Sequence, residues 1–254
     1  KQFGASGNHV VVEEFLTGPE VSVLSFTDGK VVKPMVSSMD HKRANDHDTG
    51  LNTGGMGTVA PNPYYTPAIA AECMEKIFLP TIKAMNTEGC PFKGCLYFGL
   101  MLTPDGPKVI EYNCRFGDPE TQVVLPLLES DLLTVMEATT NGTLDKTDVK
   151  FSDGAAACVI LASGGYPLAY EKGKEITGLT AGQLNAADVT VYHAGTAIKD
   201  GRLVTNGGRV LGVTATANAL PEALKKAYAA TESIHFDKLH KRSDIGARAL
   251  AAMQ

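Results

Sequence analysis

The sequence predicts an α+β fold, in which antiparallel hairpins are covered by helices and followed by a small α/β module. Two hairpin patterns and two stretches with helical spacing occupy the first 140 residues. From residue 151 the sequence changes to short β-rich stretches and one helical stretch. A hydrophobic content of 44% and a charged content of 20% over 254 residues are typical of a folded chain with one large or two modest domains.

Charge, hydropathy and cysteine content argue against several classes of function. The net charge of −5 argues weakly against a nucleic-acid partner, although small anionic ligands need only local positive charge. No apolar run approaches the roughly 20 residues that span a bilayer, and no secretory signal is visible. The five cysteines show no metal-ligand spacing and indicate reduced thiols. We therefore expect a cytoplasmic protein with no membrane and no nucleic-acid partner.

The first predicted elements follow from local patterns near the N-terminus. Residues 9–16 (HVVVEEFL) are expected to form a buried strand that ends in polar residues. Residues 18–38 predict a hairpin that turns at Asp28-Gly29, a pair typical of tight turns. Residues 40–63 have almost no apolar content, and we expect a long loop there.

Two helices and a second hairpin are predicted further along the chain. Apolar residues recur with helical spacing over 67–88, and Pro80 is expected to interrupt that helix. Residues 94–113 predict the second hairpin, which turns at a Pro-Asp-Gly sequence. A second helix is expected over 119–139, with Asp118 as its N-cap and a proline at its first position.

The polar, turn-like residues 141–148 are the candidate domain boundary, which predicts domains at 1–140 and 141–254. The second domain is expected to contain a strand and turn at 154–167, and a helix that begins at Pro221. Further strands are expected at 189–198, 202–208 and 209–217.

The residues EYNCR at 111–115 carry the clearest chemical signal. Side chains at alternate positions of a strand share one face, so Glu111, Asn113 and Arg115 are expected to project together. A carboxylate and an amide oxygen are hard ligands that suit Mg²⁺, and a guanidinium beside them would stabilise a phosphoryl group. The alternative is an exposed strand face that carries an ion pair.

Other motifs extend this signal into a family resemblance. Residues 11–20 resemble the nucleotide hinge of the ATP-grasp superfamily, and 111–115 match its Glu-x-Asn-x-Arg metal strand. Blocks similar to one member family, glycinamide ribonucleotide synthetase, occur in order at 40–43, 52–57, 115–122, 193–196, 205–211 and 242–246. The resemblance runs from about Phe3 to the C-terminus.

The resemblance implies a fold and an activity. Residues 1–140 would form the second half of an ATP-grasp domain, an antiparallel sheet with helices, and 141–254 the small α/β C-terminal domain of that family. The family uses ATP to join glycine to 5-phosphoribosylamine through glycyl phosphate. The products are glycinamide ribonucleotide, ADP and phosphate, in purine biosynthesis.

The resemblance also implies roles for particular residues. Glu111 and Asn113 would hold Mg²⁺ or Mn²⁺, and Arg115 and Lys42 would act on the transferring phosphoryl group. The expected ATP-binding residues are Glu13, Glu14, Phe15, Leu16 and Glu20. The expected substrate-binding residues are Asp40, Gly54, Gly55, Gly117 and Asp118.

Several of these positions have simpler interpretations. Asp118 could serve only as a helix cap, and Glu120 could serve the helix dipole or contact a ligand. The glycines of 52–57 could form a flexible loop, or could bind substrate through backbone N–H groups. His41 is expected to be solvated in its polar loop. Cys114, on the opposite face of the metal strand, is expected to pack in the core.

Two features depart from the family pattern. Gly99 stands where many ATP-grasp proteins carry a second acidic metal ligand. The family's N-terminal part is not in the sequence, so we expect a missing N-terminal part of the same polypeptide as a partner, and no synthetase activity from this chain alone. The alternatives are another ATP-grasp ligase or biotin-dependent carboxylase subunit, and a nucleotide-binding fragment without catalysis.

Overall fold

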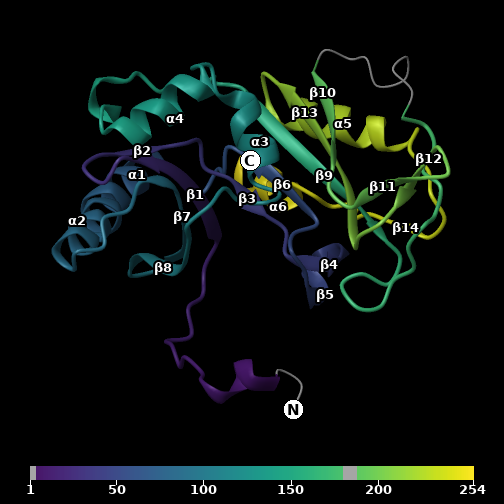
Figure 1. Cartoon of the computed structure of the whole chain (residues 1–254), viewed down its shortest axis with the longest axis horizontal. Coiled ribbons are helices and arrows are strands. Elements are labelled where there is room, and N and C mark those ends of the chain that lie inside the picture. The colour runs from purple at the N-terminus through teal and green to yellow at the C-terminus, as the bar shows by residue number, and fades with distance from the viewer. Residues whose placement is uncertain (1–3, 180–187) are drawn as a thin grey trace.

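The computed structural model describes residues 4–179 and 188–254, which form two antiparallel sheets with helices between and around them (Figure 1). The first sheet has the strand order β2-β1-β7-β8. Its strands are β1 (Glu20–Thr27), β2 (Val32–Pro34), β7 (Gly94–Thr103) and β8 (Gly106–Asn113). Both hairpins expected from the sequence are therefore confirmed, with β1 pairing β2 and β7 pairing β8.

Helices cover both faces of the first sheet. Alternate residues of β1 point in opposite directions, so Val21 and Val23 lie in one apolar cluster while Leu24 and Phe26 lie in another. The first cluster contains residues of α1 (Pro67–Cys73) and α2 (Leu79–Thr87), and the second contains residues of α3 (Thr121–Val124) and α4 (Leu132–Asn141).

The second sheet runs β10-β13-β9-β6-β3, and β14 also pairs with β9. Its central strand β9 is buried along its whole length. The strand has the sequence AAACVILAS, so the strand predicted at 154–167 is confirmed. Helix α5 (Leu220–Thr231) packs against β9 and β13. The strands are β3 (Met39–Asp40), β6 (Gly57–Ala60), β9 (Ala155–Ser163), β10 (Val189–His193), β13 (Arg209–Ala217) and β14 (Leu239–His240).

The remaining elements are short. Two small hairpins pair β4 with β5 and β11 with β12, and the chain ends with α6 (Ala247–Ala252). The hairpin strands are β4 (Arg43–Asn45), β5 (Thr49–Asn52), β11 (Thr196–Lys199) and β12 (Arg202–Thr205). Short 3₁₀ turns lie at Gly4–Asn8, Asp46–Asp48, Leu125–Leu127 and Leu144–Lys146. No helix within residues 4–179 and 188–254 is long and apolar enough to cross a bilayer.

The buried strand expected at residues 9–16 does not form. This segment is extended away from the body of the fold (Figure 1), and Val12 and Phe15 are 91% and 90% exposed. A strand needs a neighbour to pair its backbone N–H and C=O groups, and no strand of the described residues pairs with this segment. The apolar sequence was therefore a misleading signal for local structure.

The prediction of a long loop over residues 40–63 is also wrong. The segment contains β4, β5 and the buried strand β6, which lies between β3 and β9. A Cβ atom at Gly57 would lie 2.7 Å from the carbonyl oxygen of Cys158, so close strand contact requires glycine there. Because β6 is the short sequence Gly-Thr-Val-Ala, its composition did not distinguish it from a loop.

The helix at 67–88 is confirmed, but its irregular turn lies before Pro80. Residues Met74–Phe78 form a π-helical turn, in which the amide of Leu79 donates to the carbonyl of Met74. Proline lacks the amide hydrogen that an α-helix would use at position 80, and a wider turn accommodates the missing bond.

The single helix expected over 119–139 is broken into α3 and α4. Pro126 has no amide hydrogen to continue α3, and a new helix begins after Asp131, whose Oδ1 accepts from the amide of Thr134 at 2.7 Å. Asp118 does not cap α3. Its Oδ1 accepts instead from Nε2 of Gln122 at 3.0 Å.

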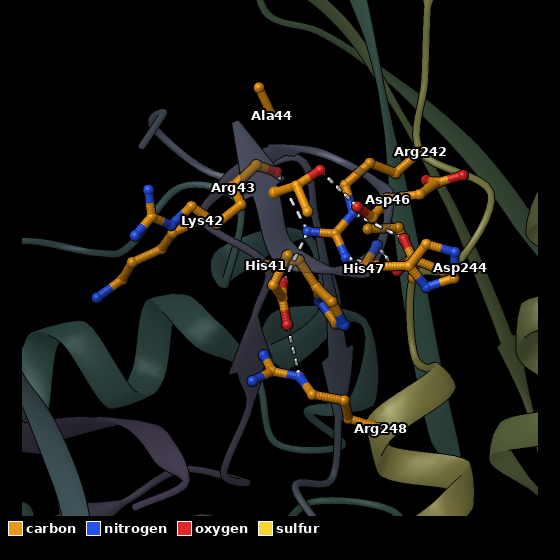
Figure 2. A network of polar contacts seen from close by, with 12 residues as sticks. His41, Lys42, Arg43, Ala44, Asp46, His47, Arg242, Asp244 and Arg248 are labelled. Carbon is orange, nitrogen blue, oxygen red and sulfur yellow. Dashed lines mark hydrogen bonds and ion pairs between the residues drawn. The ribbon is translucent and has the colours of Figure 1, made fainter. Parts of the chain in front are cut away.

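One buried arginine connects the polar segment that contains β4 and β5 to the C-terminal residues (Figure 2). The Arg242 side chain is 1% exposed. It donates from Nε and Nη2 to the two oxygens of Asp244 at 2.7 and 2.8 Å. Its Nη1 donates to Oδ1 of Asp48 at 2.9 Å and to the carbonyl of Arg43 at 3.1 Å. The buried guanidinium thus binds two partly exposed carboxylates and one backbone carbonyl.

The same contact region includes His41, which is 1% exposed rather than solvated as expected. The amide of Gly246 donates to its Nε2 at 3.0 Å, so the proton of the neutral ring lies on Nδ1 and is donated to the carbonyl of Gly57 at 3.1 Å. Burial, reinforced by the positive charges of Arg242 and Arg248, lowers the pKa of His41 to about 4.

We expect Arg242→Met to lower the free energy of unfolding by about 3–5 kcal/mol, because it leaves Asp48 and Asp244 without their buried cationic partner. Urea unfolding would measure the change. Arg248→Met is the matched control, since its 52% exposed side chain also pairs with Asp48 but should contribute at most about 1 kcal/mol. Equal losses in the two variants would contradict a special role for Arg242.

The His41 pKa predicts a pH dependence of stability. The ring titrates near 6.5 in the unfolded chain and near 4 in the folded one, so the unfolded state binds the extra proton between these values. The contribution of His41 is fully present above pH 6.5 and is lost as the pH falls to 4, by about 3 kcal/mol. His41→Asn should remove this component from a pH series of unfolding curves, whereas His47→Gln, at an exposed ring, should not.

Candidate active site

A polar cavity of about 170 Å³ lies between β8, the start of α3 and the segment around β3–β5. It brings together residues from three sequence-distant motifs. Its lining contains seven residues named from the sequence as site candidates, Asp40, Lys42, Gly54, Glu111, Asn113, Arg115 and Asp118, together with Thr53, Tyr97 and Glu120.

Glu111 and Asn113 share one face of β8, as the strand period predicted, whereas the strand ends before Arg115, which lines the same cavity from the turn that follows. Nδ2 of Asn113 donates to Oε1 of Glu111 at 3.2 Å, and Nη2 of Arg115 approaches Oδ1 of Asn113 at 3.4 Å. Gly99 lies opposite Glu111 in β7, and a Cβ there would lie 3.0 Å from Cγ of Glu111. The glycine therefore leaves room for the Glu111 side chain rather than supplying a ligand.

The donor set on β8 suits a hard divalent cation. Glu111 offers a carboxylate and Asn113 an amide oxygen, and both line the polar cavity. No group of three or more His, Cys, Asp or Glu side chains within the described residues could hold a metal by itself. Mg²⁺ commonly takes one or two protein oxygens and completes its shell with phosphate oxygens and water, so these residues fit such an ion only together with a phosphate ligand.

Lys42 provides positive charge across the cavity from β8. Its Nζ lies 2.7 Å from Oε2 of Glu20, and its side chain is 35% exposed. Burial disfavours the charged amine, but the hydrogen bond and charge of Glu20 outweigh burial and raise the pKa of Lys42. Lys42 therefore stays cationic. Glu20, expected at a ribose, is held by this ion pair.

Two acidic side chains, Asp40 and Glu120, line the cavity close enough for their charges to interact. Oε1 of Glu120 accepts from the Tyr97 hydroxyl at 3.1 Å and from the Ser22 hydroxyl at 3.3 Å. Burial raises the pKa of Glu120, and burial together with the Glu120 charge raises the pKa of Asp40 well above its usual range. Glu120 thus lies in the cavity wall, where the sequence left its role open.

The position of the Glu120 carboxylate explains why residue 117 is a glycine. A Cβ at Gly117 would lie 2.5 Å from Oε2 of Glu120, so a side chain there would displace the buried carboxylate. Gly55 has a positive φ of 108°, and its Cβ would lie 2.7 Å from Oδ1 of Asp40. Neither glycine lines the cavity itself, but each allows an acidic side chain of the cavity wall to lie close to the backbone.

The glycine-rich loop does not offer free amides to a ligand. The amide of Gly54 donates to the Tyr166 hydroxyl at 2.9 Å, and the amide of Gly55 donates to Oγ1 of Thr53 at 2.9 Å. The amides of Thr53 and Met56 donate to backbone carbonyls at 2.8 Å. The expected contact through backbone N–H groups is therefore not supported, because all four donors are used within the protein.

The residues expected to bind ATP lie mostly in a second cavity. Glu13, Glu14, Phe15 and Leu16 border a space of about 320 Å³ beside residues of β7 and β8. Within it, Nζ of Lys108 lies 2.8 Å from the Glu14 carboxylate. The candidate residues thus form two groups, one along residues 13–16 and one around β8, which share strand β8 as a wall.

Sequence reasoning missed Tyr97, Thr53 and the role of Arg209. Tyr97 lies directly opposite Asn113 in the β7–β8 register, so the hairpin pattern could have indicated it. Arg209 comes from β13, and no local pattern connects it to the site. Cys114 was expected in the core, but it is exposed and borders an apolar groove between β8 and α2.

Comparison with known families agrees with the motifs. The phosphoribosylglycinamide synthetase ATP-grasp (A) domain model matches residues 1–121, and the phosphoribosylglycinamide synthetase C domain model matches residues 156–248. The chain is 49% identical over 253 residues to the phosphoribosylamine–glycine ligase of Vibrio parahaemolyticus. It is 51% identical to part of the chicken (Gallus gallus) trifunctional purine biosynthetic protein adenosine-3.

These matches cover nearly all of this chain but only part of each relative. They span 99% of the chain, 58% of the Vibrio ligase and 25% of the chicken protein. The crystal structure of phosphoribosylamine–glycine ligase from Thermotoga maritima superposes with a TM-score of 0.82 at 39% identity, over 92% of this chain and 57% of that one.

A biotin carboxylase from Campylobacter jejuni superposes with a TM-score of 0.64 at 13% identity, over 90% of this chain and 48% of that one, and this likeness shows a shared fold alone. The expected α+β architecture of an ATP-grasp protein is thereby confirmed. With matches to its ATP-grasp domain and then to its C domain, the chain belongs to the phosphoribosylglycinamide synthetase family.

Proposed function

We propose that the chain acts in the ATP-dependent ligation of glycine to 5-phosphoribosylamine, which forms glycinamide ribonucleotide, ADP and phosphate in purine biosynthesis. The family and the names of its relatives support the reaction. The observation that carries the proposal is that Glu111 and Asn113 of β8, Arg115 just beyond it, and Lys42 line one polar cavity. Phosphoryl transfer requires chiefly such positioning and charge neutralisation.

Each charged residue then has a defined task. Glu111 and Asn113 would hold Mg²⁺, or Mn²⁺, which when bound neutralises phosphate oxygens. Arg115 and Lys42 would stabilise negative charge on the phosphoryl group as the glycine carboxylate attacks it and as glycyl phosphate forms. Lys42 is suited to this because its ion pair with Glu20 keeps it charged and oriented.

The acceptor substrates would occupy the inner part of the same cavity. We assign Asp40, Gly54 and Asp118 to its substrate-facing wall, and we propose that Gly55 and Gly117 act from behind this wall by making room for Asp40 and Glu120. As the amine forms an amide bond it loses a proton. Burial raises the pKa values of Asp40 and Glu120, and we propose that the ionised form of one of these carboxyls takes the proton.

ATP would extend from β8 toward residues 13–16. The second cavity, bordered by Glu13, Glu14, Phe15 and Leu16, offers an apolar surface and two carboxylates beside the strand that carries the metal ligands. Glu20 would contact the ribose while it orients Lys42. Exposure of Phe15 and of neighbouring apolar residues agrees with a surface that a ligand or further protein covers.

The domain division and the location of the protein remain part of the proposal. We place the ATP-grasp part at 1–140 and the C-terminal domain at 141–254, with β6 of the first pairing β9 of the second. The five cysteines form no disulfide, which agrees with a cytoplasmic enzyme.

Replacing one metal ligand tests the proposal. We expect Glu111→Gln to lower phosphate release from ATP at least about 100-fold, because an amide cannot supply the anionic oxygen that Mg²⁺ requires. The assay contains ATP, Mg²⁺, glycine and 5-phosphoribosylamine. It uses the chain alone and the chain joined to the remaining part of the Vibrio ligase, since the chain spans 58% of that relative.

Glu137→Gln is the matched control, because it makes the same chemical change at an exposed position of α4. Omission of glycine or of 5-phosphoribosylamine should abolish formation of glycinamide ribonucleotide in the unmodified protein. Full activity of Glu111→Gln in the joined protein would refute the role of Glu111 as a metal ligand. Product formation without ATP would refute the proposed ATP-dependent ligation.

A further inference from the structure

Two side chains from the C-terminal half, those of Tyr166 and Arg209, form hydrogen bonds with Gly54 of the glycine-rich loop. The amide of Gly54 donates to the hydroxyl of Tyr166 at 2.9 Å, and Nη1 of Arg209 donates to the carbonyl of Gly54 at 2.7 Å. Both polar groups of this residue are therefore bound by side chains more than 100 residues away in sequence. The orientation of the peptide groups at Gly54 is fixed from outside the loop.

Arg209 also reaches the second loop of the cavity. Its Nη1 donates to the carbonyl of Asp118 at 3.0 Å and lies 3.2 Å from Oδ1 of the same residue. Its side chain is only 19% exposed. Gly54 and Asp118 both line the cavity, whereas Arg209 and Tyr166 lie behind them. One guanidinium thus joins two walls that come from different parts of the chain.

Glycines make this arrangement possible. A Cβ at Gly54 would lie 3.2 Å from Cζ of Arg209 and 3.3 Å from the Tyr166 hydroxyl. A Cβ at Gly208 would lie 2.2 Å from Cδ2 of Tyr166, so the ring packs directly on the backbone before Arg209. The motif Asn-Gly-Gly-Arg at 206–209 therefore places both side chains against the loop.

We propose that Arg209 and Tyr166 are positioning residues of the active site, which fix Gly54 and Asp118 and so set the shape of the substrate-facing wall. This inference rests on the proposed function. Loss of Arg209 would release Asp118 and leave the Gly54 carbonyl without its cationic donor at the edge of a site for anionic groups. Small displacements of such walls lower turnover strongly, because reacting groups must be aligned closely.

Amide hydrogen exchange tests the contacts without any assay of activity. We expect Tyr166→Phe and Arg209→Met to speed exchange of the Gly54 amide about tenfold or more, since each removes one of its anchors. Tyr170→Phe is the matched control, because its ring lies beside that of Tyr166 at 6.2 Å, and it should leave Gly54 unchanged. Exchange at Val23, in the core strand β1, reports whether each variant remains folded.

Steady-state kinetics of the joined protein test the consequence. Arg209→Met should lower kcat about tenfold or more while the KM for ATP changes less than about threefold, because the cavity beside residues 13–16 contains neither Arg209 nor the residues that it holds. Arg209→Lys should restore part of kcat, since a single cation can still donate to Gly54. A merely structural role would instead reduce stability while kcat per folded molecule stayed unchanged.

The outcomes separate this inference from the proposed function. Faster exchange at Gly54 with reduced kcat supports positioning. Unchanged exchange at Gly54 in both variants, or unchanged kcat in Arg209→Met, overturns it. If the unmodified joined protein forms no product, the proposed function fails on its own, and the exchange at Gly54 still decides whether Arg209 and Tyr166 hold the cavity wall.

Discussion

The polar segment from Asp40 to Gly57 has too few apolar side chains to form a core, so polar contacts with the C-terminal half determine its conformation. His41 and Arg43, on either side of Lys42, are bonded to the C-terminal segment at 242–246. The Lys42 side chain itself points away from this network (Figure 2). A buried arginine with two carboxylate partners can hold such a segment because removal of the arginine leaves two carboxylates without their shared cation.

This dependence explains why the site needs both sheets. Strand β8 presents Glu111 and Asn113 from the first sheet, where pairing with β7 determines their common face, and Arg115 follows just beyond the end of the strand. The opposite wall lies between β3 and β6, two strands that belong to the second sheet. The cavity therefore exists only where the two sheets meet, and contacts far behind it control its shape.

Much of the fold and half of the site follow from local sequence. The strand period at 111–115 predicted a shared face for its charged residues, and turn residues located both hairpins. Strand β6 could not be predicted, because a short Gly-Thr-Val-Ala sequence becomes a strand only through pairing with β9. The opposite error occurred at residues 9–16, where an apolar run predicted a strand that does not form because no neighbouring strand pairs with it. The contacts of Arg209 and Arg242 depend on tertiary structure and carry no local signal.

Anomalous diffraction from Mn²⁺ bound together with a non-hydrolysable ATP analogue would test the central assignment most directly. The assignment predicts a manganese peak within bonding distance of a Glu111 carboxylate oxygen and of Oδ1 of Asn113, with the terminal phosphate between the metal and Lys42. A nucleotide bound with its metal elsewhere, or with its phosphates remote from β8, would contradict the assignment and leave the row of Glu111, Asn113 and Arg115 as an exposed polar strand face.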